Sequence, residues 1–379
     1  PLPPPADAAR QHAETLADHI RREIAAAGWI SFARFMELAL YAPGLGYYSA
    51  GATKLGAAGD FVTAPELSPL FGRCLARQAA EILAQSGGDL LELGAGSGRL
   101  ALDLWRELER LGQTPRRYCI LEVSADLALR QRAFFAAASP ALASHAEWLA
   151  APPEDFTGLI LANEVLDALP VHRVAWRATG IFEQGVALEN GAFVWRERPA
   201  QGELLAAARR LEPAPDYESE IALAAPALVA TLAASLAKGA LLFVDYGFGR
   251  REFYHPERRQ GTLMCHYRHH AHGDPFFLPG LQDITAHVDF SATAESGVRA
   301  GLDLLGYTSQ AAFLVNSGVT DLLRETQDGD TTAYLARANE VQRLTSPAEM
   351  GELFKVIALG RGITPPLTGF ARGDRRHAL

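Results

Sequence analysis

The segment LELGAGSGRL, residues 91–100, constrains the fold of this chain more than any other short stretch. An apolar run carrying Glu92 is followed by glycines at alternate positions, Gly94, Gly96 and Gly98, and then by a helical pattern. A buried strand, a glycine-rich turn and a helix in this order are typical of a unit that binds a nucleotide-derived ligand. The turn therefore predicts an α/β domain with its ligand site at the carboxyl end of this strand.

Further strands and helices alternate around this turn. Strands are predicted at 89–93, 117–124, 158–164 and 240–247, helices at 71–85, 100–111 and 125–138, and a final edge strand at 354–362. Such alternation predicts a mostly parallel sheet covered by helices on both faces, the Rossmann-like α/β class.

The rest of the chain follows other patterns. Two helices are predicted between Ala6 and Tyr41, broken near Gly28 and restarted with Ser31 as N-cap. Residues 171–199 alternate in the manner of antiparallel strands, and residues 201–236 look helical. We expect four consecutive segments: an N-terminal helical and lid region at 1–85, a first part of the core at 86–178, an insertion at 179–237, and the remaining core at 238–379 with a substrate-side loop at 248–290.

Composition restricts the class of protein. The 379 residues suffice for one large domain with insertions or for two domains, and 44 acidic against 35 basic residues give a net charge of −9. This charge disfavours sequence-independent nucleic-acid binding, which depends on a cationic surface. Three widely spaced cysteines predict neither a disulfide framework nor a zinc knuckle, and favour a reducing compartment: bacterial cytoplasm or mitochondrial matrix. No apolar run is long enough to span a bilayer, and the start PLPPPADAAR lacks a signal-peptide layout and an initiator Met.

Three ligands compete for the glycine turn. A Walker A loop requires Gly-Lys-Ser/Thr, but Gly98 is followed by Arg99 and Leu100. A dinucleotide fingerprint requires a third glycine where Arg99 stands. The pattern E-x-G-x-G-x-G of an S-adenosylmethionine (SAM) loop is complete from Glu92 to Gly98. A tight turn without any ligand remains the fourth interpretation.

Charge favours SAM over a pyrophosphate. A carboxylate a few ångströms from a diphosphate costs about 1 kcal/mol or more, whereas SAM carries a cationic sulfonium and ammonium that Glu92 attracts. Glu122, at the end of the next strand, is predicted to accept hydrogen bonds from the ribose hydroxyls, a role that also suits NAD.

Two polar stretches add candidate residues. NEVLDALPV places Asn163, Glu164 and Asp167 just beyond a strand, where they form either part of the site or a helix start whose acids favour the dipole. GDFVTAPELSPLFG holds Asp60, Thr63, Glu66 and Ser68, and is either a capped helix start or a lid over the cofactor, with Thr63 as a cofactor contact. The histidines of residues 261–290 show no helical metal-binding spacing, so a substrate-facing loop is favoured over a metal site.

Several motifs in order resemble the MidA family of SAM-dependent methyltransferases. They are GLGYYS, GDFVTAPELSPLFG, LELGAGSGRLA, NEVLDALPV, FVDYG, GTLMCHYRHHAHGDPFFLPGLQDITAHVDF and MGELFKVIALGRG, spread from about residue 13 to residue 362. The resemblance implies a seven-strand methyltransferase core with added helical elements. It also implies SAM as cofactor and, from the family's mitochondrial complex I assembly factor, a protein arginine methyltransferase acting on a complex I subunit or similar protein.

The family's cofactor loop corresponds to Glu92, Gly94, Gly96 and Gly98, its ribose acid to Glu122, and its NE-x-x-DALP motif to Asn163, Glu164, Asp167 and Pro170. A guanidinium stays protonated in water, so carboxylates must orient it and stabilise charge during transfer. Glu164 and Asp167 are the first candidates, with Asp60 and Asp245 behind them. Two other functions stay open: a SAM-binding assembly factor that acts by holding a partner protein, and an NAD-dependent oxidoreductase.

Overall fold

A computed structural model describes residues 2–50, 63–211, 213, 215–325 and 331–379. The chain divides into two compact units, each gathered from three separated stretches. The first unit contains Pro1–Phe61, Leu166–Ala227 and Arg250–Asp289, and the second contains Val62–Val165, Leu228–Gly249 and Phe290–Leu379. The four segments predicted from the sequence divide the chain in consecutive order, which is a different kind of division, and they stay a prediction.

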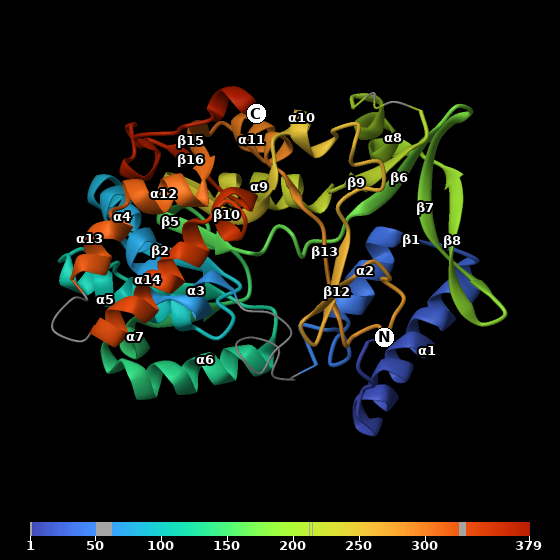
Figure 1. Ribbon diagram of the computed structural model, residues 1–379, viewed down its shortest axis with the longest axis horizontal. Helices are drawn as coiled ribbons and strands as arrows, with labels where there is room; N and C mark the ends of the chain where they lie inside the picture. Colours follow the sequence, from blue (N-terminus) through green and yellow to red (C-terminus); the bar gives the residue numbers. More distant parts are fainter. Residues whose placement is uncertain (1, 51–62, 212, 214, 326–330) are drawn as a thin grey trace. The chain divides into compact units, whose positions relative to one another are not determined.

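The second unit is built around a mostly parallel sheet (Figure 1). Its strands lie in the order β15-β16-β10-β5-β2-β3-β4. β10, β5, β2, β3 and β4 pair in parallel, while β16 pairs antiparallel with both β10 and β15. Their bounds are β2 Asp89–Leu93, β3 Tyr118–Leu121, β4 Ala146–Leu149, β5 Phe156–Asn163, β10 Leu236–Phe248, β15 Asp303–Ser309 and β16 Phe354–Arg361. This arrangement confirms the predicted α/β class.

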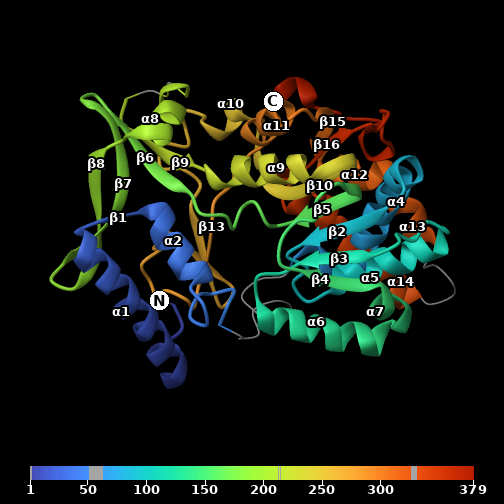
Figure 2. The same cartoon turned by 180° about the vertical axis from the view of Figure 1, so that it is seen from behind.

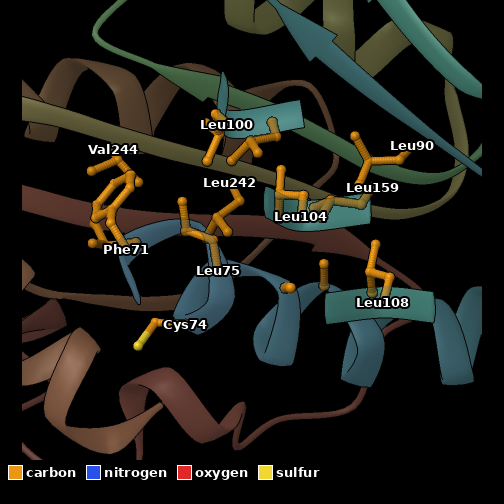
Figure 3. Packing of buried hydrophobic residues seen from close by; sticks show 14 of the residues in the cluster. Phe71, Cys74, Leu75, Leu90, Leu100, Leu104, Leu108, Leu159, Leu242 and Val244 are labelled. Atoms are coloured by element: carbon orange, nitrogen blue, oxygen red, sulfur yellow. The ribbon is translucent and has the colours of Figure 1, made fainter. Parts of the chain in front are cut away.

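Helices cover both faces of this sheet. On one face, α4 and α5 bring Phe71, Leu75 and Leu104 against Leu159 and Leu242 of the strands, and all are buried (Figure 3). On the other face, α11 packs on β15 and β16, where Gly297 lies beside Leu359. The helices of the unit are α3 Ala64–Leu67, α4 Pro69–Ser86, α5 Arg99–Arg110, α6 Ala125–Ala138, α7 Pro140–His145, α11 Phe290–Arg299, α12 Gln310–Asn316, α13 Val319–Arg324, α14 Thr331–Thr345 and α15 Met350–Leu353. Helix α9 Ala224–Ser235 crosses from the first unit into the second.

The first unit combines a helical hairpin with antiparallel sheets, seen from behind in Figure 2. Helices α1 Asp7–Ala27 and α2 Phe32–Tyr41 are separated by β1 Ile30–Ser31, and Ser31 caps α2 by accepting a hydrogen bond from the Arg34 amide. β1 joins β7 in the order β1-β7-β6-β9, and β8 pairs with β7. The remaining bounds are β6 His172–Arg177, β7 Gly180–Glu189, β8 Ala192–Pro199, α8 Gly202–Arg209, β9 Tyr217–Ile221, α10 Arg250–Phe253, β11 Met264–Tyr267, β12 His270–His272, β13 Asp283–Thr285 and β14 Val288–Asp289.

Three sequence predictions about elements were wrong. Residues 201–236 are not one helical region, because β9 lies between α8 and α9. The segment 248–290 is not wholly irregular, since it forms α10 and a small sheet in the order β12-β11-β13. β16 is not an edge strand, because β15 pairs with its outer side. In the part of the chain that the structure describes, no helix combines the length and apolar character needed to cross a membrane.

Candidate active site

The glycine turn joins β2 to α5. β2 is buried along its whole length, and Gly94, Gly96 and Gly98 follow with φ values of 61°, 54° and 82°. Only glycine adopts this left-handed region without a penalty. Gly98 also has no space for a side chain, because a Cβ there would lie 2.7 Å from Cε1 of Phe135 on α6. The turn is thus fixed both by backbone conformation and by close packing.

Strand register brings three predicted cofactor residues to one level. Leu93 pairs with Leu121 of β3 on one side and with Ala162 of β5 on the other. The next residue along each parallel strand is therefore Gly94, Glu122 or Asn163, and all three stand at the carboxyl edge of adjacent strands. This edge is where open α/β sheets hold their ligands.

Glu92 lies beneath the turn and is only 2% exposed. The Tyr118 hydroxyl donates a 2.6 Å hydrogen bond to Oε2 of Glu92. Burial raises the pKa of Glu92 to about 7, aided by the nearby Glu122 charge and opposed by the Tyr118 hydrogen bond. A cation beside this carboxyl would lower its pKa and favour the carboxylate.

Glu122 is held by three donors, the Val123 and Ser124 amides and the Gln131 side chain. The Ser124 amide donates to its Oε1 at 2.9 Å, and Nε2 of Gln131 donates to its Oε2 at 3.1 Å. Burial raises the pKa of Glu122 above its usual value, and these donors oppose that shift. Gln131, on α6, also donates to the Gly96 carbonyl at 2.9 Å. The place of Gln131 could not be predicted from the sequence, because a single glutamine within a helical pattern carries no signal of burial.

The stretch before α4 contacts the glycine turn through Glu66. The Ser97 hydroxyl donates a short hydrogen bond to Glu66 of α3, and the Arg99 guanidinium lies 3.7 Å from the other oxygen of that carboxylate. Thr63 occupies the N-cap position of α3, but its side chain makes no capping hydrogen bond; Ser68 instead caps α4. Asp60 lies outside the described residues. The cofactor contact expected of Thr63 stays a prediction.

Asn163, Glu164 and Asp245 lie close together where β5 ends beside β10. Nδ2 of Asn163 donates to Oε1 of Glu164 at 3.0 Å, and Oδ1 of Asn163 is buried without a hydrogen-bond partner among the described residues. Glu164 has a left-handed φ of 52°, which is unusual for a residue with a side chain and is concentrated at functional positions. Asp245 holds this turn, since its Oδ2 accepts the Val165 amide at 3.2 Å and its Oδ1 accepts the Tyr246 amide at 2.9 Å.

Asp167 and the histidine-rich segment belong to the first unit. Asp167 is 5% exposed, and its carbonyl accepts the Ala286 amide at 3.1 Å. The structure therefore assigns Asp167 and Glu164 to different units. Among the residues described here, no group of three or more His, Cys, Asp or Glu side chains is arranged to hold a metal ion.

The carboxyl edge of the second unit suits a cationic nucleoside. It offers a glycine turn, the Glu122 carboxyl level with that turn, the buried Glu92 carboxyl, and Oδ1 of Asn163, which accepts no hydrogen bond from the part of the chain that the structure describes. A parallel sheet with its candidate site at the carboxyl edge is the architecture that holds nucleotide-derived ligands, and an acidic residue in the glycine loop favours the cationic SAM over a diphosphate. The class of protein that combines these features is a SAM-binding methyltransferase.

Comparison with known proteins gives the same class and adds the family. Residues 74–308, more than half of the chain, match the family described as "Putative S-adenosyl-L-methionine-dependent methyltransferase". The zebrafish (Danio rerio) protein arginine methyltransferase NDUFAF7, mitochondrial, is 31% identical over 91% of this chain and 87% of its own length. The mouse (Mus musculus) protein of the same name is 30% identical over 90% of this chain and 83% of its own.

A solved structure is more similar still. A COG1565 superfamily member from Burkholderia thailandensis, crystallised with S-adenosyl-homocysteine, is 53% identical with a TM-score of 0.97, and each chain is covered over 100%. The chain described here belongs to this family of SAM-dependent methyltransferases. The predicted family, enzyme class and cofactor are confirmed. The individual site residues stay predictions.

Proposed function

We propose that this chain is a protein arginine methyltransferase that transfers a methyl group from SAM to a guanidinium of a respiratory complex I subunit or a similar protein. The observation that carries the proposal is the identity of 31% and 30%, over 91% and 90% of the chain, to relatives named as protein arginine methyltransferases. The three cysteines, all free and buried, support action in a reducing compartment, either bacterial cytoplasm or mitochondrial matrix.

The residues of the turn and the two neighbouring strand ends bind the cofactor in this proposal. Glu92 stabilises the positive charge of SAM, and Glu122 accepts hydrogen bonds from the ribose hydroxyls. The three glycines of the turn, which have no side chains, let the cofactor approach the backbone closely. Asn163 supplies the acceptor Oδ1. When bound, SAM provides an activated methyl group on a sulfonium.

Glu164 is the proposed catalytic carboxylate. Its main chain is fixed from two sides, because its own amide donates to the Val244 carbonyl at 2.9 Å and the next amide donates to Asp245. A carboxylate held in this way can orient a planar guanidinium by charge-assisted hydrogen bonds. Asp167, expected from its motif to be a second substrate carboxylate, stays a prediction from the sequence. Asp245, whose two oxygens accept backbone amides, is a positioning residue.

The test is transfer of a labelled methyl group from SAM to protein, in a lysate of cells lacking the enzyme, followed by mass spectrometry of the labelled band. Methylation on an arginine side chain is expected. Labelling of another residue type would refute the arginine assignment, and binding of a partner without labelling would favour an assembly factor that acts by protein contact.

The matched variants are Glu164→Gln and Glu295→Gln. Glu295 lies on α11 in the same unit with its side chain 46% exposed. We expect Glu164→Gln to keep SAM binding and lose transfer, and Glu295→Gln to keep both. Normal transfer by Glu164→Gln would remove Glu164 from the mechanism.

A further inference from the structure

A buried glutamine of the second unit links the glycine turn to the end of β3. The Gln131 side chain is 0% exposed and reaches from α6 to both the glycine turn and the end of β3. Its Nε2 lies 2.9 Å from the Gly96 carbonyl oxygen and 3.1 Å from Oε2 of Glu122. Its Oε1 lies 2.8 Å from the indole Nε1 of Trp148 on β4.

These contacts fix which way the amide faces. An indole N–H can only donate, so it requires the amide oxygen of Gln131 on its side. The amide NH₂ then has two hydrogens and two acceptors, one in the turn and one in the carboxylate. The amide oxygen and both N–H groups of Gln131 are therefore used. If the amide were reversed, its oxygen would face the Gly96 carbonyl oxygen and the Glu122 carboxylate oxygen, and neither can donate a hydrogen bond.

The indole itself is held in place by its neighbours. The ring of Trp148 packs on Phe135 with ring centroids 5.7 Å apart, and the Arg132 guanidinium lies 4.4 Å from the Trp148 ring. Phe135 is the same ring that contacts the Gly98 position of the turn. Helix α6 therefore touches the glycine turn twice, through an amide and through an aromatic ring.

We infer that Gln131, oriented by Trp148, is a positioning residue that sets the Glu122 carboxylate and the glycine turn in one geometry for the cofactor's ribose. The inference rests on the proposed ribose-binding role of Glu122. Each carboxylate oxygen accepts about two hydrogen bonds. The Ser124 amide, the Val123 amide and Gln131 use three of these roughly four positions, which leaves one for a ribose hydroxyl.

The test compares S-adenosylhomocysteine with its 2′,3′-dideoxy analogue by calorimetry, because only the ribose hydroxyls distinguish these ligands. The wild-type protein is expected to prefer S-adenosylhomocysteine by about ten-fold or more, as hydrogen bonds to a charged acceptor imply. Gln131→Met is expected to reduce that preference by about ten-fold. Trp148→Phe keeps an aromatic ring and removes only the N–H, so it is expected to reduce the preference less, and it serves if Gln131→Met does not fold.

Two variants separate the possible failures. Gln310→Met removes another fully buried amide, which donates to the Leu344 carbonyl, and is expected to lower stability while leaving the preference unchanged. Glu122→Gln is expected to lose the preference, with no further loss on adding Gln131→Met. If Glu122→Gln loses it while Gln131→Met and Trp148→Phe keep it, the role of Gln131 is refuted. If Glu122→Gln keeps it, the ribose role of Glu122 fails, and the inference with it.

Discussion

The buried carboxyl of Glu92 makes cofactor affinity depend on pH. Its pKa of about 7 belongs to the protein without a cation beside it. A sulfonium or ammonium brought close to Glu92 stabilises the carboxylate, so binding favours the ionised form. Affinity for SAM is therefore expected to rise as pH increases through 7.

The size of the effect follows from the ionised fraction. With a pKa of about 7, Glu92 is ionised in about one molecule in eleven at pH 6 and about ten in eleven at pH 8. If only the ionised form binds, the dissociation constant for SAM falls about ten-fold over this range, which is about 1.4 kcal/mol.

The assay is calorimetric titration of SAM at pH 6, 7 and 8 into the wild-type protein and into Glu92→Gln. The amino group of SAM titrates near pH 8 in both experiments, so the difference between the two proteins isolates Glu92. The wild-type affinity should rise about ten-fold relative to the variant. Parallel pH profiles for the two proteins would refute the electrostatic role of Glu92.

The same pKa predicts a pH dependence of stability. Glu92 ionises near 4.5 in the unfolded chain and near 7 in the folded one. Its contribution is thus fully present below pH 4.5 and declines between pH 4.5 and 7, because the folded state holds the proton more tightly. The shift corresponds to about 3 kcal/mol. Urea unfolding should show Glu92→Gln gaining stability relative to wild type from pH 5 to pH 8; a constant difference would contradict the raised pKa.

Three further predictions concern the second unit. Glu164→Gln should lower kcat for methyl transfer by about 10²-fold or more with little change in the dissociation constant for S-adenosylhomocysteine, measured by single-turnover kinetics and calorimetry. Gly98→Ala should cost about 1–3 kcal/mol of unfolding free energy and weaken cofactor binding, because it combines a φ of 82° with a contact to Phe135; wild-type stability would refute the packing argument. Burial raises the pKa of Cys74 to about 12 and of Cys119 to about 11, so iodoacetamide should label these two thiols at pH 8 only after unfolding. Labelling of either thiol in the native protein, detected by peptide mapping, would contradict the raised pKa values.

The bounds of helices and strands could be predicted where the sequence holds a local signal, such as a glycine turn or a helix N-cap. β2 and α6 have the predicted bounds, because an apolar run ending at a glycine turn and a helix after Ser124 are local signals. β9 was missed because its five residues, YESEI, lie between segments rich in alanine and leucine, and its strand form depends on pairing with β6.

The candidate site shows the same division between local and tertiary information. Glu92, the glycines and Glu122 could be predicted as site residues from spacing, charge and strand ends, and the structure places them at or next to one edge of the sheet. Gln131 could not be found in this way, because its importance arises from two distant acceptors that only the folded chain brings within 3.1 Å. The partition of Glu164 and Asp167 into different units was equally hidden, since they are three residues apart in the sequence.

Side-by-side titration of this protein with S-adenosylhomocysteine and with NADH shows whether the turn after β2 accepts a sulfur nucleoside and rejects a diphosphate. Saturable binding of S-adenosylhomocysteine, weakened about ten-fold by Glu122→Gln, with no binding of NADH, is the predicted result. Saturable NADH binding together with no binding of S-adenosylhomocysteine would show that the turn accepts a diphosphate and rejects a sulfur nucleoside.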